Sequence, residues 1–309
     1  MNKLLPFIKL LIGWPLSTIA ILFIIKFLLD NYSKISGRFG EIKIEFLFLS
    51  ILLFFLYYFL RGFLWKQILE SKEQKVNFFE NLYRYEISEL KRFVPGNIWS
   101  FLSRGVQFSE LGVDKKIVGV SILMEIQLVL SGSFLFSLLC FPLILNDAVL
   151  REKIIALIPL SLTVAAIFFI ATAYLYHKKY DKNMTLIKSI YLPGVSIASK
   201  IKLTLISTFT FIIFGLANYL IYASSFGFSI ENLIYLSSFF TFALLVGYLS
   251  FFTPMGLGVR EGVIILGLSK GIGTINSSFF AIFSRVVLIV SELSYLLLLL
   301  LIKIIFRLR

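Results

Sequence analysis

Residues 279–302 read FFAIFSRVVLIVSELSYLLLLLLI. A helix of about 20 apolar residues is long enough to cross the hydrocarbon core of a bilayer, so this run predicts a transmembrane helix. The sequence therefore predicts an all-α fold, a polytopic transmembrane helix bundle that forms a single integral membrane domain over residues 1–309. Comparable apolar runs recur near residues 7–29, 46–64, 117–145, 154–176, 203–226 and 233–252.

One further apolar stretch, residues 262–275, is shorter and rich in glycine. It predicts a re-entrant or broken helix rather than a simple crossing, which gives seven to eight membrane elements in all. The chain divides into half-repeats of roughly 1–150 and 151–309, because each half contains one proline- and glycine-rich break between apolar runs.

The composition supports a membrane protein. The 309 residues are 59% hydrophobic and 15% charged, whereas a soluble domain is about half apolar and a quarter charged. The first apolar run is longer than a signal-peptide core and has no cleavage site after it, which favours a membrane span. Cys140 is the only cysteine and His177 the only histidine, so an intramolecular disulfide and a Cys/His zinc site are excluded. We expect no cofactor and no metal.

The net charge of +13 is concentrated in particular loops. Lysine and arginine gather after the second and fourth predicted spans, in residues 61–116 and 178–202, which is the positive-inside pattern of a cell-membrane protein. The pattern predicts a cytoplasmic N-terminus and no nucleic-acid partner. Basic residues of the C-terminal tail favour counting 262–275 as a crossing. This topology places both glycine-rich breaks on the cytoplasmic side.

Residues 76–93 read VNFFENLYRYEISELKRF, which alternate apolar and charged positions at helical spacing. A span that faces lipid could not carry so many charges, because each costs about 2.5–3.5 kcal/mol near the bilayer centre. The favoured interpretation is an amphipathic helix at the membrane surface. The alternative is a helix that lines a polar cavity.

Two breaks resemble each other. Residues 94–105 read VPGNIWSFLSRG and residues 253–262 read TPMGLGVREG. Paired breaks of this kind in the two halves of a transporter point to its binding site, because they free backbone groups that only protein or a wet cavity can satisfy. Ordinary surface turns are the alternative for either break taken alone. The predicted substrate-binding positions within the breaks are Pro95, Gly96, Pro254, Gly256 and Gly258.

Charged residues also interrupt the apolar runs. Glu125 lies in one span, and Arg285 and Glu292 share one face of another. Ionisable groups in a span indicate function, although ion pairs that only fix helix packing are the alternative. Arg61 lies near a predicted span end, where its side chain can reach the interface, so it receives no role. Asn218 is interpreted as an interhelical hydrogen-bonding residue.

The arginines of the breaks and spans are the candidates for holding an anionic group. Guanidinium keeps its charge in a partly dry site and binds phosphate through two parallel hydrogen bonds. Arg104, Arg260 and Arg285 take this role. Glu125, Glu261 and Glu292 are expected to balance the charge of the empty site, to contact an amine or to carry a coupling proton.

At these residues the chain resembles the lysylphosphatidylglycerol synthase/flippase transmembrane family. PMGLGVREG followed by an apolar helix with Arg285 is similar to one family motif, and RFVPGNIWSFLSR followed by Gly112 and Glu125 is similar to another. The resemblance covers nearly the whole chain. It departs from the family where Ile126 follows Glu125 and where no aspartate precedes Asp147. The 309 residues leave no room for a soluble aminoacyl-transfer domain.

The resemblance implies a membrane module that moves lipid between leaflets, with a synthase or a glycan-assembly enzyme as partner. The leading hypothesis is therefore a lipid flippase or lipid-linked intermediate transporter for an anionic or phosphate-bearing headgroup. The substrate would be a membrane lipid or a polyprenyl-phosphate-linked molecule. No nucleotide-binding motif occurs, so movement would be downhill, proton-coupled or driven by the membrane potential. The alternatives are a membrane-embedded polyprenyl or phospholipid transferase, for which no catalytic motif is found, and a non-catalytic accessory protein.

Overall fold

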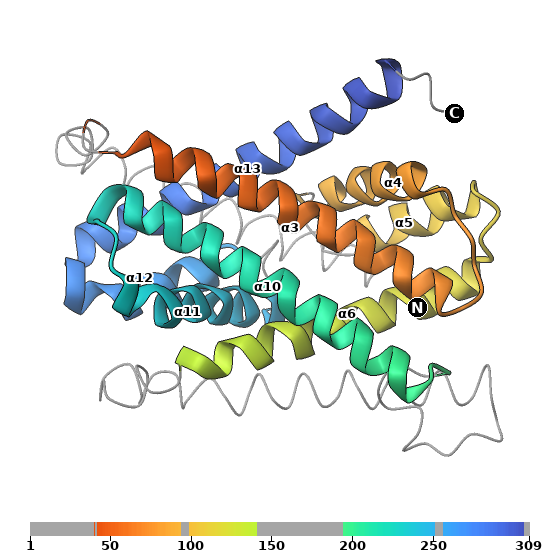
Figure 1. Ribbon diagram of the computed structural model, residues 1–309, viewed down its shortest axis with the longest axis horizontal. Coiled ribbons are helices and arrows are strands. Elements are labelled where there is room, and N and C mark those ends of the chain that lie inside the picture. The colour runs from red at the N-terminus through yellow and green to blue at the C-terminus, as the bar shows by residue number, and fades with distance from the viewer. Residues whose placement is uncertain (1–39, 41, 94–98, 141–193, 251–255, 306–309) are drawn as a thin grey trace, which may run out of the picture.

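The computed structural model describes residues 40, 42–93, 99–140, 194–250 and 256–305 (Figure 1). These residues form helices only, which confirms the predicted all-α bundle. The long helices are α3 (Ile44–Glu70), α6 (Lys115–Ser137), α10 (Ile197–Phe226), α11 (Ile230–Leu249) and α13 (Thr274–Ile305). The shorter ones are α4 (Phe78–Leu90), α5 (Trp99–Ser109) and α12 (Val259–Ile272), with 3₁₀ turns η1 (Lys91–Phe93) and η2 (Leu138–Cys140).

Five of the described helices, α3, α6 (with η2), α10, α11 and α13, are long and apolar enough to cross a membrane. They coincide with five of the predicted spans, while the spans expected at 7–29 and 154–176 lie outside the described residues. The predicted end of the second span is too early, because α3 continues to Glu70. Arg61 therefore lies well inside a helix rather than near its end.

Helices α3 and α10 run antiparallel along their length and form the centre of the bundle. At one end the backbone N–H of Lys43 donates to the carbonyl of Ser224 at 2.9 Å. At the other end Lys202 Nζ donates to Gln67 Oε1 at 2.6 Å. These two contacts join the opposite ends of the antiparallel pair.

The same packing order recurs on the two sides of this central pair. Helix α6 packs against α10 and α11, just as α13 packs against α3 and α4. Helices that follow each other in sequence also pack together, so that α4 packs on α5 and α11 packs on α12. Whether the two sets are sequence repeats stays a prediction.

The helices that precede the two breaks begin at opposite ends of the bundle. Helix α4 begins beside the end of α3, and Lys303 near the end of α13 donates to Glu80 of α4 at 2.7 Å. Helix α11 begins instead at the other end, directly after α10 (Figure 1). That both breaks lie on the cytoplasmic side stays a prediction.

Small residues allow the central helices to approach closely. A Cβ atom on Gly132 of α6 would lie 2.8 Å from the backbone carbonyl carbon of Ser207 in α10. A Cβ atom on Gly215 of α10 would lie 2.3 Å from the carbonyl oxygen of Ser237 in α11. Membrane helices pack through such small residues because lipid tails offer no hydrophobic driving force between them.

We predict that Gly132→Ala lowers the free energy of unfolding by about 1–3 kcal/mol, because the added methyl group forces α6 away from α10. The control is Gly119→Ala on the same helix, where a Cβ meets no atom within 4 Å. That change should be neutral or stabilising by about 0.5–1 kcal/mol. Thermal unfolding of the purified protein in mild detergent measures both, and equal midpoints for the two variants would contradict the packing argument.

Candidate functional site

Helix α4 turns its charged face into the bundle. Glu80, Glu86 and Glu89 are only 5%, 1% and 5% exposed. A helix at the membrane surface would present these carboxylates to water, so the favoured interpretation of residues 76–93 is wrong and the alternative, a helix lining a polar interior, holds. The helix begins where the Asn77 side chain accepts the backbone N–H groups of Phe79 and Glu80, which caps its first turn.

Arg104 lies at the centre of the α4–α5 hairpin and is 0% exposed. Its guanidinium donates to Glu89 and to Glu125, one carboxylate from α4 and one from α6. The same group lies 4.7 Å from the ring centroid of Trp65 and 4.4 Å from that of Tyr85, which are cation–π distances. Arg104 is thus held by two anions and two aromatic faces.

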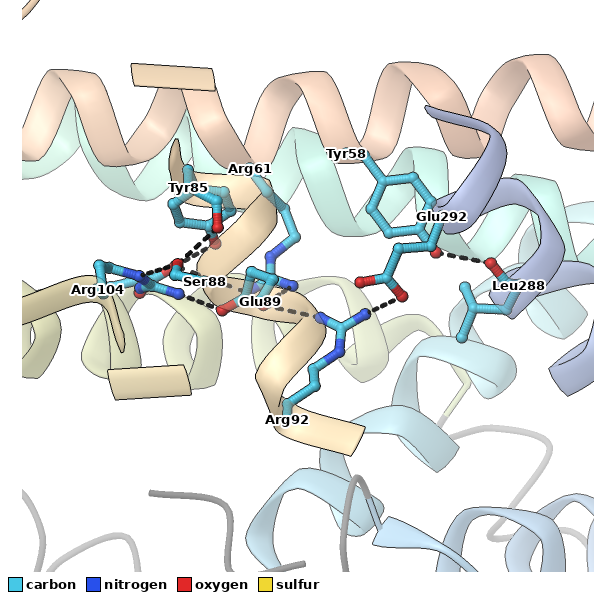
Figure 2. A network of polar contacts seen from close by, with 10 residues as sticks. Tyr58, Arg61, Tyr85, Ser88, Glu89, Arg92, Arg104, Leu288 and Glu292 are labelled. Carbon is cyan, nitrogen blue, oxygen red and sulfur yellow. Dashed lines mark hydrogen bonds and ion pairs between the residues drawn. The ribbon is translucent and has the colours of Figure 1, made fainter. Parts of the chain in front are cut away.

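Glu89 is the shared partner of three arginines. Besides Arg104, it accepts Arg61 Nη1 at 2.7 Å and Arg92 Nη1 at 2.8 Å (Figure 2). Burial alone would raise the pKa of this carboxyl, but the nearby arginines, Arg61 first, lower the pKa of Glu89 to about 2. One carboxylate therefore joins α3, η1 and α5 and remains ionised.

Arg61 and Arg92 extend the network to further helices. Arg61 Nη2 lies 3.6 Å from Glu125 Oε1 in α6. Arg92 Nη2 donates to Glu292 Oε2 in α13 at 2.6 Å. Figure 2 shows Arg92 between Glu89 and Glu292, so it joins α4 to α13.

The second break places different partners around its arginine. Arg260 is 2% exposed, and its Nη2 donates to Asn218 Oδ1 at 3.0 Å and to Ser284 Oγ at 3.4 Å. Its Nε has no hydrogen-bond partner in the part of the chain that the structure describes. Asn218 thus joins α10 to α12, as the sequence analysis proposed.

Glu261 and Arg285 pair with each other. Arg285 Nη1 donates to Glu261 Oε1 at 2.6 Å, which ties α13 to the first turn of α12. Glu261 Oε2 also accepts the backbone N–H of Gly258 at 2.8 Å and so caps that helix. In the VREG stretch, Glu261 therefore stabilises the first turn of α12 inside an apolar bundle.

The glycines of the second break allow backbones to touch. Gly256 has φ 65° and Gly258 has φ 88°, in the left-handed region that favours glycine. A Cβ on Gly256 would lie 2.5 Å from Gly247 Cα, so the chain after the break lies directly against α11.

A cavity of about 160 Å³ lies where these helices meet. Its charged lining consists of Arg61, Glu89, Arg92 and Glu125, and most of the remaining wall is aromatic or aliphatic. Both breaks contribute residues to its wall: Ser100 and Phe101 belong to the break at 94–105, and Gly256 belongs to the break at 253–262. The apolar and aromatic wall comprises Tyr57, Phe101, Ile126, Val129, Phe211, Phe214, Leu244, Tyr248 and Leu288.

The predicted site residues fall into three groups. Glu125 and Gly256 line the cavity, whereas Pro95, Gly96 and Pro254 lie outside the described residues. The others do not line it and lie in the protein around it: Arg104, Gly258, Arg260, Glu261, Arg285 and Glu292. Within the described residues, no cluster of three His, Cys, Asp or Glu side chains is placed to hold a metal ion.

Sequence reasoning missed Arg61, Glu89 and Arg92 as site residues. One available signal was the apolar pattern in residues 64–69, which continues the helix beyond Arg61 and moves that charge into the interior. Glu89 and Arg92 carry no comparable signal, because a buried polar face and a solvated one have the same helical spacing.

The fold and this cavity define a multi-pass membrane protein with a charged internal site. The sequence model described as the lysylphosphatidylglycerol synthase TM region matches residues 7–293. The chain belongs to this family, which links it to membrane lipids. A comparison with the curated proteins finds no match.

We predict that Glu89→Gln lowers the free energy of unfolding by about 3–5 kcal/mol, because it removes the shared anion of one buried and two partly buried arginines. The same substitution at Glu110 is the control. Glu110 pairs with Arg84 but its side chain is 55% exposed, so its loss should change stability by less than about 1 kcal/mol. Thermal unfolding in detergent tests both, and equal destabilisation would contradict a central role for Glu89.

Proposed function

We propose that this protein moves a lipid with a phosphate-bearing headgroup across the bilayer. The observation that carries the proposal is the internal cavity, which combines two arginines with a largely apolar wall inside a bundle of membrane helices. At about 160 Å³ it is smaller than a typical drug-sized ligand pocket, so it suits a headgroup while the tails stay in the bilayer.

Arg61 and Arg92 are the groups proposed to hold the phosphate. Both line the cavity, and each binds one carboxylate oxygen of Glu89 through its Nη1 atom, a contact that a phosphate oxygen can also make. An entering phosphate would replace part of the contacts to Glu89. Because both arginines pair with Glu89 in the empty protein, neither of these two charges is left unpaired between transport events.

The two broken hairpins are proposed as re-entrant segments that close the cavity. Helix α12 has 14 residues, which gives a length of about 21 Å against a hydrocarbon core of about 30 Å. Its start at Val259 lies inside the bundle and its end at Gly273 connects to α13. Movement at the glycine-rich start of this helix would open the cavity toward one leaflet, and movement of the α4–α5 hairpin toward the other.

We place the protein in the cell membrane with its basic end on the cytoplasmic side. Lys202 at the start of α10 and Lys303 at the end of α13 lie at the end where α3 finishes and α4 begins. The basic loop after α3 is therefore on the same side as both, in agreement with the positive-inside pattern. We extend this orientation to the N-terminus.

We predict that Arg61→Gln and Arg92→Gln each slow lipid movement at least tenfold. A hydrogen bond to a charged group contributes about 1.5–3 kcal/mol, which corresponds to roughly a tenfold to hundredfold change. Arg84→Gln is the matched control, because Arg84 pairs with Glu80 and Glu110 and does not line the cavity.

The measurement is movement of fluorescent phosphatidylglycerol between leaflets of proteoliposomes that contain the full chain. A parallel series contains a fluorescent polyprenyl phosphate. If the wild type moves neither lipid faster than empty vesicles, the proposed function is wrong. Wild-type rates in both cavity variants would remove the assigned role of the arginines.

A further inference from the structure

A pair of buried carboxyl groups lies next to the cavity and is not part of its wall. Glu86 in α4 is 1% exposed and Glu292 in α13 is 0% exposed. The Oε1 atoms of both residues have no hydrogen-bond partner among the residues that the structure describes. Glu292 exerts the strongest electrostatic influence of any charged group on Glu86.

A third polar group supports a shared proton at this place. The hydroxyl of Tyr295, one turn after Glu292, is buried and also lacks a hydrogen-bond partner within the described part of the chain. It interacts electrostatically with Glu86. Burial and the neighbouring Glu292 carboxylate raise the pKa of Glu86 well above its ordinary value. The charged and titratable groups around the pair are Tyr58, Arg61, Glu89, Arg92 and Tyr295.

The charge balance of the network gives the number of protons. Three arginines contribute +3, and Glu86, Glu89, Glu125 and Glu292 contribute −4 when all are ionised. A single proton on the Glu86–Glu292 pair makes the sum zero. Helices α4 and α13 pack against each other, so these two buried carboxyl groups lie in one dry interior, where both cannot ionise at low cost.

We propose that Glu86 and Glu292 form a proton-carrying pair that holds one proton when the cavity is empty and gains a second when an anionic headgroup binds Arg92. This inference rests on the proposed function. Arg92 connects the two sites, because it lines the cavity and donates to Glu292 at 2.6 Å (Figure 2). When a phosphate binds Arg92, the Glu292 carboxylate loses its ion pair with that guanidinium.

In the proton step the bond to hydrogen in a buffer acid breaks and one O–H bond forms at a carboxylate oxygen of Glu292, so the buffer base is left in solution. That O–H bond breaks when the headgroup leaves and Arg92 returns. Linkage fixes the sign: since the bound state holds one more proton than the empty state, the headgroup binds more tightly as the pH falls. For one proton the change is about tenfold per pH unit.

The first test is infrared spectroscopy of the full chain in detergent without added lipid. The wild type at neutral pH should show the carbonyl band of a buried protonated carboxyl group. Glu86→Gln should remove that band, and Glu110→Gln, at an exposed position, should leave it. No such band in the wild type, or a band that persists in Glu86→Gln, overturns the proposal.

The second test adds short-chain phosphatidylglycerol. Calorimetry in buffers of different ionisation enthalpy should show uptake of about one proton per bound lipid in the wild type and none in Glu292→Gln. Affinity should rise about tenfold per pH unit on acidification only where Glu292 is present. Uptake that is zero in the wild type, or unchanged in Glu292→Gln, overturns the coupling.

The outcomes separate the two proposals. A carboxyl band that disappears in Glu86→Gln supports the protonated pair even if proteoliposomes move no lipid, and that result overturns only the proposed function. Lipid movement with a pH-independent affinity overturns the proton coupling and leaves the proposed function standing. If one glutamine variant does not fold, the wild-type band and the wild-type proton count still decide the inference.

Discussion

The burial of Glu89 among three arginines is the interaction on which this structure depends. Each charge alone would be very unfavourable inside an apolar bundle, and each is acceptable because its partners arrive from other helices. Helix α4 can therefore keep its carboxylates inside the bundle. The position of the cavity follows, because Glu89 and its arginine partners Arg61 and Arg92 also form its polar wall.

The fold could be predicted from the sequence to the extent that apolar length determines it. Five predicted spans coincide with long helices because about 20 apolar residues have few alternatives to a membrane helix. What failed was the placement of residues 76–93 at the membrane surface. Residues 76–93 carry charges that argue against lipid contact, yet those charges face protein, and hydropathy does not distinguish these two surroundings.

The candidate site could be predicted only in part, for a related reason. The unusual residues stood out: an arginine beside each break and glutamates within spans, all of which the structure places in or near the central network or the start of α12. Which of them reach the cavity depends on side-chain partners from distant helices. Arg104 is enclosed by Glu89 and Glu125, whereas Arg61, which seemed to lie at a span end in the sequence, reaches the cavity because α3 continues past it.

Helices α4 and α11 begin at opposite ends of the bundle, and different forces hold the α4–α5 hairpin and the start of α12. The α4–α5 hairpin is held by ion pairs around Glu89, while the start of α12 is held by backbone contact between Gly247 and Gly256 as well as by its own ion pair. In the proposed transporter one gate is therefore mainly electrostatic and the other largely steric. Headgroup charge acts chiefly on the first gate, whereas the second responds to side-chain volume. The two leaflets would then select lipids by different criteria, charge on one side and bulk on the other.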